Sequence, residues 1–188
     1  MSDYHGEDNV DIAPHMETLE RYAEKAAFIL EIGCGAGNGS CRAFRRGLAK
    51  SQVPPELKLH ISIDINSEHP AYDRPTEPYW YKVSGDSRSQ EAFNKVLDTV
   101  ANYSLGDRTP DIIFIDTDHT YEQMQLELEL WDRLAGPNTI WLFHDTWMGG
   151  PYNHMTDAIK EFAAAHGLVY KDLSKASHGL GWMGRDNG

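Results

Sequence analysis

From residue 28 almost to the end, short apolar runs rich in β-branched residues alternate with segments whose apolar residues recur at helical spacing. This alternation is typical of βαβ units, in which helices pack on a mostly parallel sheet. The runs that fit strands are 28–32, 59–65, 79–83, 111–116, 139–143, 168–173 and 180–183. The sequence therefore predicts an α/β fold with a doubly wound, mostly parallel seven-stranded sheet that has helices on both faces.

The chain has 188 residues, which is enough for one domain with a substantial core and too few for two domains of ordinary size. Residues 1–14 show no periodicity, so we expect a flexible N-terminal tail there and a single domain over residues 15–188. Apolar residues then recur at helical spacing over residues 16–26, beginning with Met16 and Leu19. We expect this helix to lead into the first strand.

The charge balance disfavours nucleic acid as a partner. Lys and Arg number 17 against 29 Asp and Glu, which gives a formal net charge of −12, whereas phosphate contacts need clustered basic side chains. No stretch approaches the ~20 apolar residues that span a bilayer, and the polar N-terminus lacks the pattern of a secretory leader. Cys34 and Cys41 match neither a disulfide framework nor a metal knuckle. We therefore expect a cytoplasmic protein with no membrane attachment.

Two Ser/Thr-x-x-Gln patterns predict helix starts. Ser87 and Gln90 form one pattern, and Thr120 and Gln123 form the other, each followed by apolar residues on one helical face. In such a pattern the first side chain accepts a hydrogen bond from the backbone N–H three residues later. The sequence therefore predicts that helices begin after Ser87 and after Thr120.

Acidic or polar side chains follow the carboxyl end of each of the first five predicted strands. In an open α/β sheet these ends share one edge, and ligands bind there, near the point where the strand order reverses. Any one of these acids could be a turn residue or a helix cap, but packing does not explain polar groups at five successive strand ends. We therefore expect the functional site at this edge, formed by Glu31, Asp64, Asp86, Asp116, His144 and Asp145.

The turn after the first strand reads Glu31-Ile32-Gly33-Cys34-Gly35-Ala36-Gly37. Its glycines let the backbone approach a ligand closely, and the following helix aims N–H groups at that ligand. Asn38 stands where a dinucleotide-binding pattern has its third glycine, which disfavours a nicotinamide-dependent oxidoreductase. The negative charge of Glu31 before the turn favours a cationic ligand over a pyrophosphate.

The segment 30–37 resembles the first motif of class I S-adenosylmethionine-dependent methyltransferases, and the resemblance spans roughly residues 28–184. It implies a Rossmann-like methyltransferase fold that binds S-adenosylmethionine. In that family the glycine loop lies against the amino acid part of the cofactor; the residues that match it here are Glu31, Gly33, Cys34, Gly35 and Gly37. By the same likeness, Asp64 binds the ribose hydroxyls, and Asp86 and Ser87 lie against the adenine.

The segment 114–122, followed by His144-Asp145-Thr146, resembles a subgroup of small-molecule O-methyltransferases that includes enzymes acting on antibiotic sugars. In these relatives an acid after the fourth strand and a polar pair after the fifth bind a divalent metal, usually magnesium. The matching positions here are Asp116, His144 and Asp145. Because magnesium prefers oxygen ligands, His144 leaves open magnesium, a softer ion such as manganese, and a metal-free site in which His144 is the base.

The resemblance implies methyl transfer to a hydroxyl of a small molecule such as a sugar or a secondary metabolite. A hydroxyl attacks well only after losing its proton, and Asp116 and His144 are the candidate catalytic residues. For Asp118 and His119, a role as turn residues before a helix is at least as well supported as a role in catalysis. The loop 147–154 is interpreted as a substrate lid. A non-catalytic nucleotide- or metabolite-binding module is the alternative. The domain has little insertion to cap a substrate, so a homo-oligomer that completes the pocket is also considered.

Overall fold

Each apolar run identified in the sequence forms a strand, and no boundary differs from the predicted one by more than one residue. The computed structural model describes residues 11–35, 37, 39–65, 77–103, 108–149 and 154–186. The strands are β1 (Phe28–Ile32), β2 (Leu59–Asp64), β3 (Trp80–Ser84), β4 (Ile112–Ile115), β5 (Ile140–His144), β6 (Val169–Ser174) and β7 (Leu180–Gly184).

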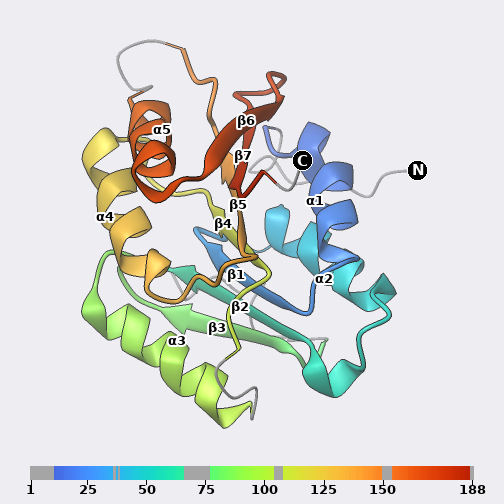
Figure 1. Cartoon of the computed structure of the whole chain (residues 1–188). Helices are drawn as coiled ribbons and strands as arrows, with labels where there is room; N and C mark the ends of the chain where they lie inside the picture. Colours follow the sequence, from blue (N-terminus) through green and yellow to red (C-terminus); the bar gives the residue numbers. More distant parts are fainter. Residues whose placement is uncertain are drawn as a thin grey trace.

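The strands form a seven-stranded sheet in the order β3-β2-β1-β4-β5-β7-β6 (Figure 1). Strands β1 to β5 run parallel, whereas β7 runs antiparallel to both β5 and β6. The chain works outward from β1 to β3 on one side and then continues from β4 on the other. The predicted doubly wound, mostly parallel seven-stranded α/β fold is therefore confirmed.

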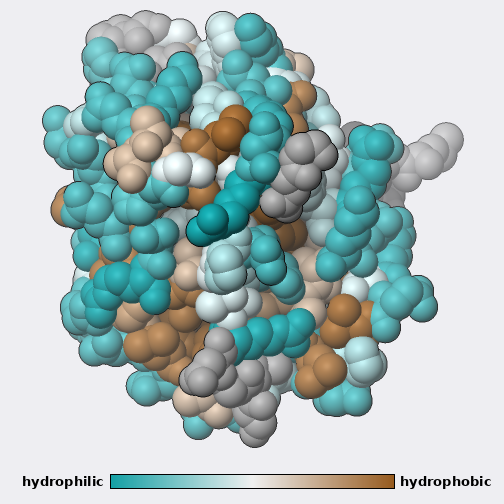
Figure 2. All heavy atoms as spheres, viewed as in Figure 1, coloured by the Kyte–Doolittle hydropathy of each residue, from teal (hydrophilic) through white to brown (hydrophobic). Residues whose placement is uncertain are grey.

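Helices cover both faces of the sheet (Figure 1). They are α1 (Met16–Ala23), α2 (Ser40–Lys50), α3 (Gln90–Asn102), α4 (Tyr121–Asp132) and α5 (Met155–His166), with short 3₁₀ helices η2 (Ala13–His15) and η3 (Pro55–Leu57). Helices α1 and α2 bury apolar side chains against one face, and α3, α4 and α5 do so against the other. No helix in the described ranges is long and apolar enough to cross a membrane. The surface in this view is mostly hydrophilic, with scattered hydrophobic residues (Figure 2).

Strands β1 and β4 lie side by side near the middle of the sheet, and every residue in them is buried. Strands covered on both faces need apolar side chains on both faces, which explains the continuous apolar run Ile112–Ile115. The strand order reverses between β1 and β4. Their carboxyl ends therefore border the crevice in which folds of this kind bind ligands.

The N-terminal segment differs from the tail predicted over residues 1–14. Residues 1–10 lie outside the described part of the chain, but Ile12 is 4% exposed and packs with the core beneath α1. His15, which ends η2, is buried as well. A single apolar residue without periodic neighbours gives no sequence signal, which is why residues 11–14 were expected to be free. The first helix also ends earlier than predicted, at Ala23.

One of the two predicted helix starts is correct. Thr120 caps α4, because its side chain accepts a hydrogen bond from Gln123 N at 3.2 Å. Helix α3, however, is capped by Ser89, whose hydroxyl accepts from Ala92 N at 3.1 Å. Ser87 instead bonds to Glu127 of α4.

Asp111 ties the beginnings of three strands together. Its Oδ2 atom accepts hydrogen bonds from Ala27 N at 2.8 Å and from Phe28 N at 2.9 Å. Its own N–H donates to Phe28 O, and its carbonyl accepts from Ile140 N at 3.0 Å. The side chain and backbone of Asp111 therefore link the amino ends of β1, β4 and β5.

We expect Asp111→Ala to lower the free energy of unfolding by about 1–3 kcal/mol, because two backbone N–H groups lose their acceptor. Urea denaturation of the variant, the parent protein and Asp98→Ala checks this. Asp98 is exposed on α3 and serves as the control. An Asp111→Ala midpoint equal to that of the parent would contradict the role given to Asp111.

Candidate active site

The glycine loop begins where β1 and β4 come into close contact. Gly33 has φ +81°, and a Cβ atom built on it would lie 1.8 Å from the carbonyl oxygen of Asp116. Its N–H donates to Ile63 O at 2.9 Å. Gly35 also has positive φ, and a Cβ there would meet no atom within 4 Å. Glycine at position 33 is therefore required by the approach of the two strands, whereas Gly35 faces open space.

A cavity of about 390 Å³ lies at the carboxyl ends of β1, β2 and β4. The backbone of the glycine loop forms one wall, and the segments after β3 and β4 form the others. The structure brings together here most of the residues predicted to bind a cofactor. Those that line the cavity are Gly33, Gly35, Asp64, Asp86, Ser87 and the strand-end Asp116.

Asp64 holds the glycine loop in place. Its Oδ2 atom accepts hydrogen bonds from Gly35 N at 2.8 Å and from Cys34 N at 3.1 Å. Gly37 N in turn donates to Cys34 O at 2.8 Å, which closes the turn. Cys34 and Gly37 are not among the residues that line the cavity in the described part of the chain. They shape the loop through their backbone.

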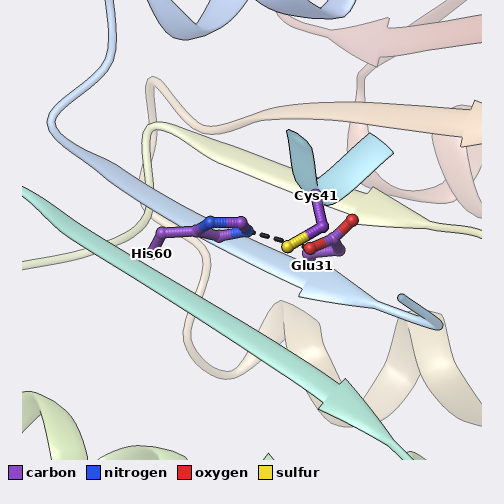
Figure 3. Close-up of side chains that lie close together, drawn as sticks. All are labelled: Glu31, Cys41 and His60. Carbon is purple, nitrogen blue, oxygen red and sulfur yellow. Dashed lines mark hydrogen bonds and ion pairs between the residues drawn. The ribbon is translucent and has the colours of Figure 1, made fainter. Parts of the chain in front are cut away.

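Glu31 lies away from this cavity, which corrects its predicted place at the cofactor. Its side chain is completely buried and points to the α2 side of the sheet, where Cys41 and His60 lie close to it (Figure 3). Ser40 Oγ donates to Glu31 Oε1 at 2.6 Å, and Ser62 Oγ donates to Oε2 at 2.7 Å. Side chains alternate along a strand, so Glu31 faces the same way as Ile29, toward α1 and α2.

The group around Glu31 fastens the beginning of α2 to β1 and β2. His60 Nε2 lies 2.9 Å from Glu31 Oε2, and the two side chains are fully buried. Oxygen, sulfur and nitrogen atoms of Glu31, Cys41 and His60 lie within 4.8 Å of one another, as in a metal site. Burial raises the pKa of the Cys41 thiol well above its usual value, and Glu31 raises it further. A protonated thiol and a hydrogen-bonded carboxylate favour a structural role.

Ser87 contacts α4 at a residue, Glu127, that the sequence analysis did not identify. Ser87 Oγ forms a short hydrogen bond to the buried carboxylate of Glu127. Thr117 Oγ1 donates to the same carboxylate at 2.7 Å, and Gln123 Nε2 donates at 2.6 Å. Glu127 therefore joins the loops that follow β3 and β4. Burial raises its pKa, although these donors oppose the shift.

A second polar cluster forms where β4 and β5 end, from the residues predicted to bind metal. His144 Nδ1 lies 3.4 Å from Asp116 Oδ1 and 3.0 Å from Asp145 Oδ2. One donor atom from each of these three residues lies within 4.8 Å of the others. His144 and Asp145 are buried, and Asp116 is partly exposed at the cavity. The structure therefore brings this predicted trio together.

Proton affinities in the cluster are strongly coupled. Burial lowers the pKa of His144, but Asp116 and Asp145 outweigh burial and raise it to about 10. Burial raises the pKa of Asp145, yet His119 and His144 together hold it well below the ordinary value. The two carboxylates therefore favour the protonated form of His144 in the unliganded site.

His119 is the functional candidate that the sequence left undecided. Its Nε2 atom lies 2.6 Å from Asp145 Oδ2, and its side chain is 29% exposed. It also lines a second cavity, of about 520 Å³, between the beginnings of α4 and α5. Residues 116–118 line the first cavity, and residues 119–120 line this one. In the sequence, the signal for a functional role of His119 was its place three residues after Asp116. The start of a helix explains the same position equally well.

We expect Glu31→Gln to reduce stability, because the amide cannot accept from both serines and from His60 as the carboxylate does. The loss in free energy of unfolding should be about 1–3 kcal/mol. Thermal denaturation should show it beside Glu56→Gln, an exposed control. Unchanged stability of Glu31→Gln would show that the buried network contributes nothing.

Solved structures show where this fold occurs. CalS11, a TDP-rhamnose 3′-O-methyltransferase of calicheamicin biosynthesis, superposes with a TM-score of 0.66 at 16% identity, covering 95% of this chain and 80% of that one. The SAH-bound Podospora anserina methyltransferase PaMTH1 gives 0.58 at 14%, with 95% and 88% covered. MycE of the mycinamycin pathway, in complex with Mg and SAH, gives 0.58 at 20%, with 93% and 50% covered. At these low identities, the superpositions show a shared fold.

The sequence itself matches a family model described as a methyltransferase domain, over residues 30–146. The comparison with curated proteins finds no match. The matched region is more than half of the chain, and it contains the glycine loop and the polar residues at the ends of β1 to β5. On this evidence the chain belongs to the methyltransferase-domain family.

Proposed function

We propose that this protein transfers a methyl group from S-adenosylmethionine to a hydroxyl of a small molecule, such as a sugar or a secondary metabolite. The observation that carries the proposal is that one segment, 116–120, lines two cavities, with Asp116 in one lining and His119 in the other. A cofactor in the first cavity and an acceptor in the second would meet at this segment. The O-methyltransferase names of several fold neighbours support the acceptor class.

The first cavity suits a cationic cofactor. Its lining includes the carboxylates of Asp64, Asp86, Asp116 and Asp118. The one cationic side chain among its described lining residues, Arg88, pairs with Asp86 at 2.8 Å. A pyrophosphate would be repelled by this surface, whereas the positively charged sulfonium and amino groups of S-adenosylmethionine would be attracted. We propose that Asp64 binds the ribose hydroxyls and that Asp86 and Ser87 lie at the adenine.

The cluster at β4 and β5 fits a divalent metal. His144 Nδ1 faces Asp116 Oδ1 and Asp145 Oδ2, and donor atoms of the three residues lie within 4.8 Å of one another. We propose Asp116, His144 and Asp145 as the ligands. A bound metal would lower the pKa of the acceptor hydroxyl and orient it. An imidazole ligand favours manganese over magnesium, and His144 must release its proton to coordinate.

His119 is proposed to accept the proton of the acceptor hydroxyl. His119 is partly exposed and lines the larger cavity, whereas His144 is buried and is a proposed metal ligand. Its hydrogen bond to Asp145 raises its pKa, and burial opposes this. Asp145 also fixes the orientation of the ring. Asp116 and His144 would then position the reacting groups.

The charge of the chain bears on its partners. The net charge of −12 supports a small-molecule acceptor rather than nucleic acid. We keep a cytoplasmic location and a homo-oligomer as predictions. A light-scattering measurement of the mass in solution addresses the oligomer.

Isothermal titration with S-adenosylmethionine tests the cofactor proposal. We expect micromolar affinity and a loss of about tenfold or more in Asp64→Asn, because the ribose hydroxyls and the glycine loop both lose an ionised acceptor. Asp98→Asn is the matched control on the surface. No binding by the parent protein would refute the proposed function; binding without turnover on any hydroxylated acceptor would favour the non-catalytic module.

His119→Gln tests the proton acceptor. We expect kcat to fall about 10²- to 10⁴-fold while S-adenosylmethionine affinity stays unchanged. Only the neutral ring accepts a proton, so the rate of the parent protein should rise with pH through the raised pKa of His119. This rise of the rate with pH should vanish in His119→Gln. The control His166→Gln changes an exposed residue at the end of α5 and should keep the rise. A full kcat in His119→Gln would assign the proton to another group.

A further inference from the structure

The N-terminal segment is anchored next to the cluster at the end of β5. The His15 ring lies 5.4 Å from the His144 ring in an edge-on arrangement, and its Nε2 is 3.4 Å from Ser177 O. Ile12 is buried in the core. Asp11 directly precedes Ile12, and its Oδ1 accepts from Ile12 N at 2.9 Å. The Asp11 carboxylate is therefore held beside the buried Ile12, although it is exposed.

The turn between β6 and β7 meets the same cluster with a strained backbone. The non-glycine residues with positive φ in the described ranges are Asp145 at 58°, Ser177 at 40° and His178 at 67°. Gly179 follows, and a Cβ on it would lie 2.8 Å from the Thr146 side chain. Such strain persists only where surrounding contacts impose it, and it gathers at functional sites. Asp145 is one of these residues, and the His178 side chain contacts its carboxylate.

Asp145 presents its two oxygen atoms to two different groups of ligands. Oδ2 faces His119 and His144. Oδ1 lies 3.3 Å from His178 Nδ1 and accepts no hydrogen bond from the described residues, although the Asp145 side chain is only 4% exposed. Donor atoms of Asp11, Asp145 and His178 lie within 4.8 Å of one another. A buried, unsatisfied carboxylate oxygen thus points into this second group.

We propose that Asp11, Asp145 and His178 form a second divalent-cation site, which shares the Asp145 carboxylate with the site at Asp116 and His144. The inference goes beyond the proposed function and rests on it only through this shared residue. Carboxylates that bridge two ions are common where the ions lie about 3.5–4 Å apart. A cation here would also offset the repulsion between the carboxylates of Asp11 and Asp145.

The donor set indicates the kind of ion. Two carboxylates and one imidazole suit manganese or a similar divalent ion better than magnesium. Asp11 is exposed and the His178 side chain is 53% exposed, so an ion can enter from solvent and keep water ligands. The inner ligands His144 and Asp145 are buried. We therefore expect the outer ion to bind more weakly and to exchange faster than the inner one.

Manganese titration by calorimetry and electron paramagnetic resonance tests the second site. We expect two Mn²⁺ per chain in the parent protein, with a spin-coupled signal at saturation. Asp11→Asn and His178→Ala should each bind one Mn²⁺ and lose the coupled signal. Asp116→Asn should lose the inner ion. His166→Ala, an exposed histidine near Asp132, is the control and should retain two.

One Mn²⁺ per chain in the parent protein, unaffected by Asp11→Asn, would overturn the second site and leave the inner metal intact. Two ions retained in both Asp11→Asn and His178→Ala would overturn it as well. Absence of any manganese binding would overturn both metal proposals, whereas the titration with S-adenosylmethionine tests the methyltransferase proposal separately. Thermal denaturation shows whether each variant is folded, and Asp11→Asn replaces an exposed carboxylate with an amide of the same shape.

Discussion

The contact between Gly33 and the backbone of Asp116 is the constraint on which the rest of the site depends. It brings the carboxyl ends of β1 and β4 together at the point where the strand order reverses. The glycine loop and the acid after β4 therefore share one crevice. Asp111 fixes the opposite ends of the same strands, so the register of the sheet determines the distance between cofactor cavity and polar cluster.

The sequence predicted the sheet well because its central strands are buried on both faces, and apolar runs such as Ile112–Ile115 have few other interpretations. It predicted the glycine loop and the cluster of Asp116, His144 and Asp145 because parallel strands bring their carboxyl ends to one edge. Glu31 was misplaced for a local reason. Its position at a strand end was visible, but the face toward which it points depends on the helices that cover the sheet.

The remaining contributions come from parts of the chain that are distant in sequence. His15 and Ser177 are 162 residues apart, yet they meet beside His144. Glu127 occupies a helical position whose neighbours are core residues. Its carboxylate accepts a hydrogen bond from Ser87, which lies in a loop distant in sequence. Such contacts arise from the folded topology, and neither spacing nor periodicity in a single sequence encodes them.

The position of β7 has a consequence for the order of folding. β7 follows the other strands in the sequence but lies between β5 and β6 in the sheet, and β6 pairs with β7 alone among the described strands. The edge of β5 therefore stays open until β7 pairs with it, and β6 can join only with or after β7. His178 lies in the turn between them. The group of Asp11, Asp145 and His178 is therefore incomplete until β7 pairs with β5.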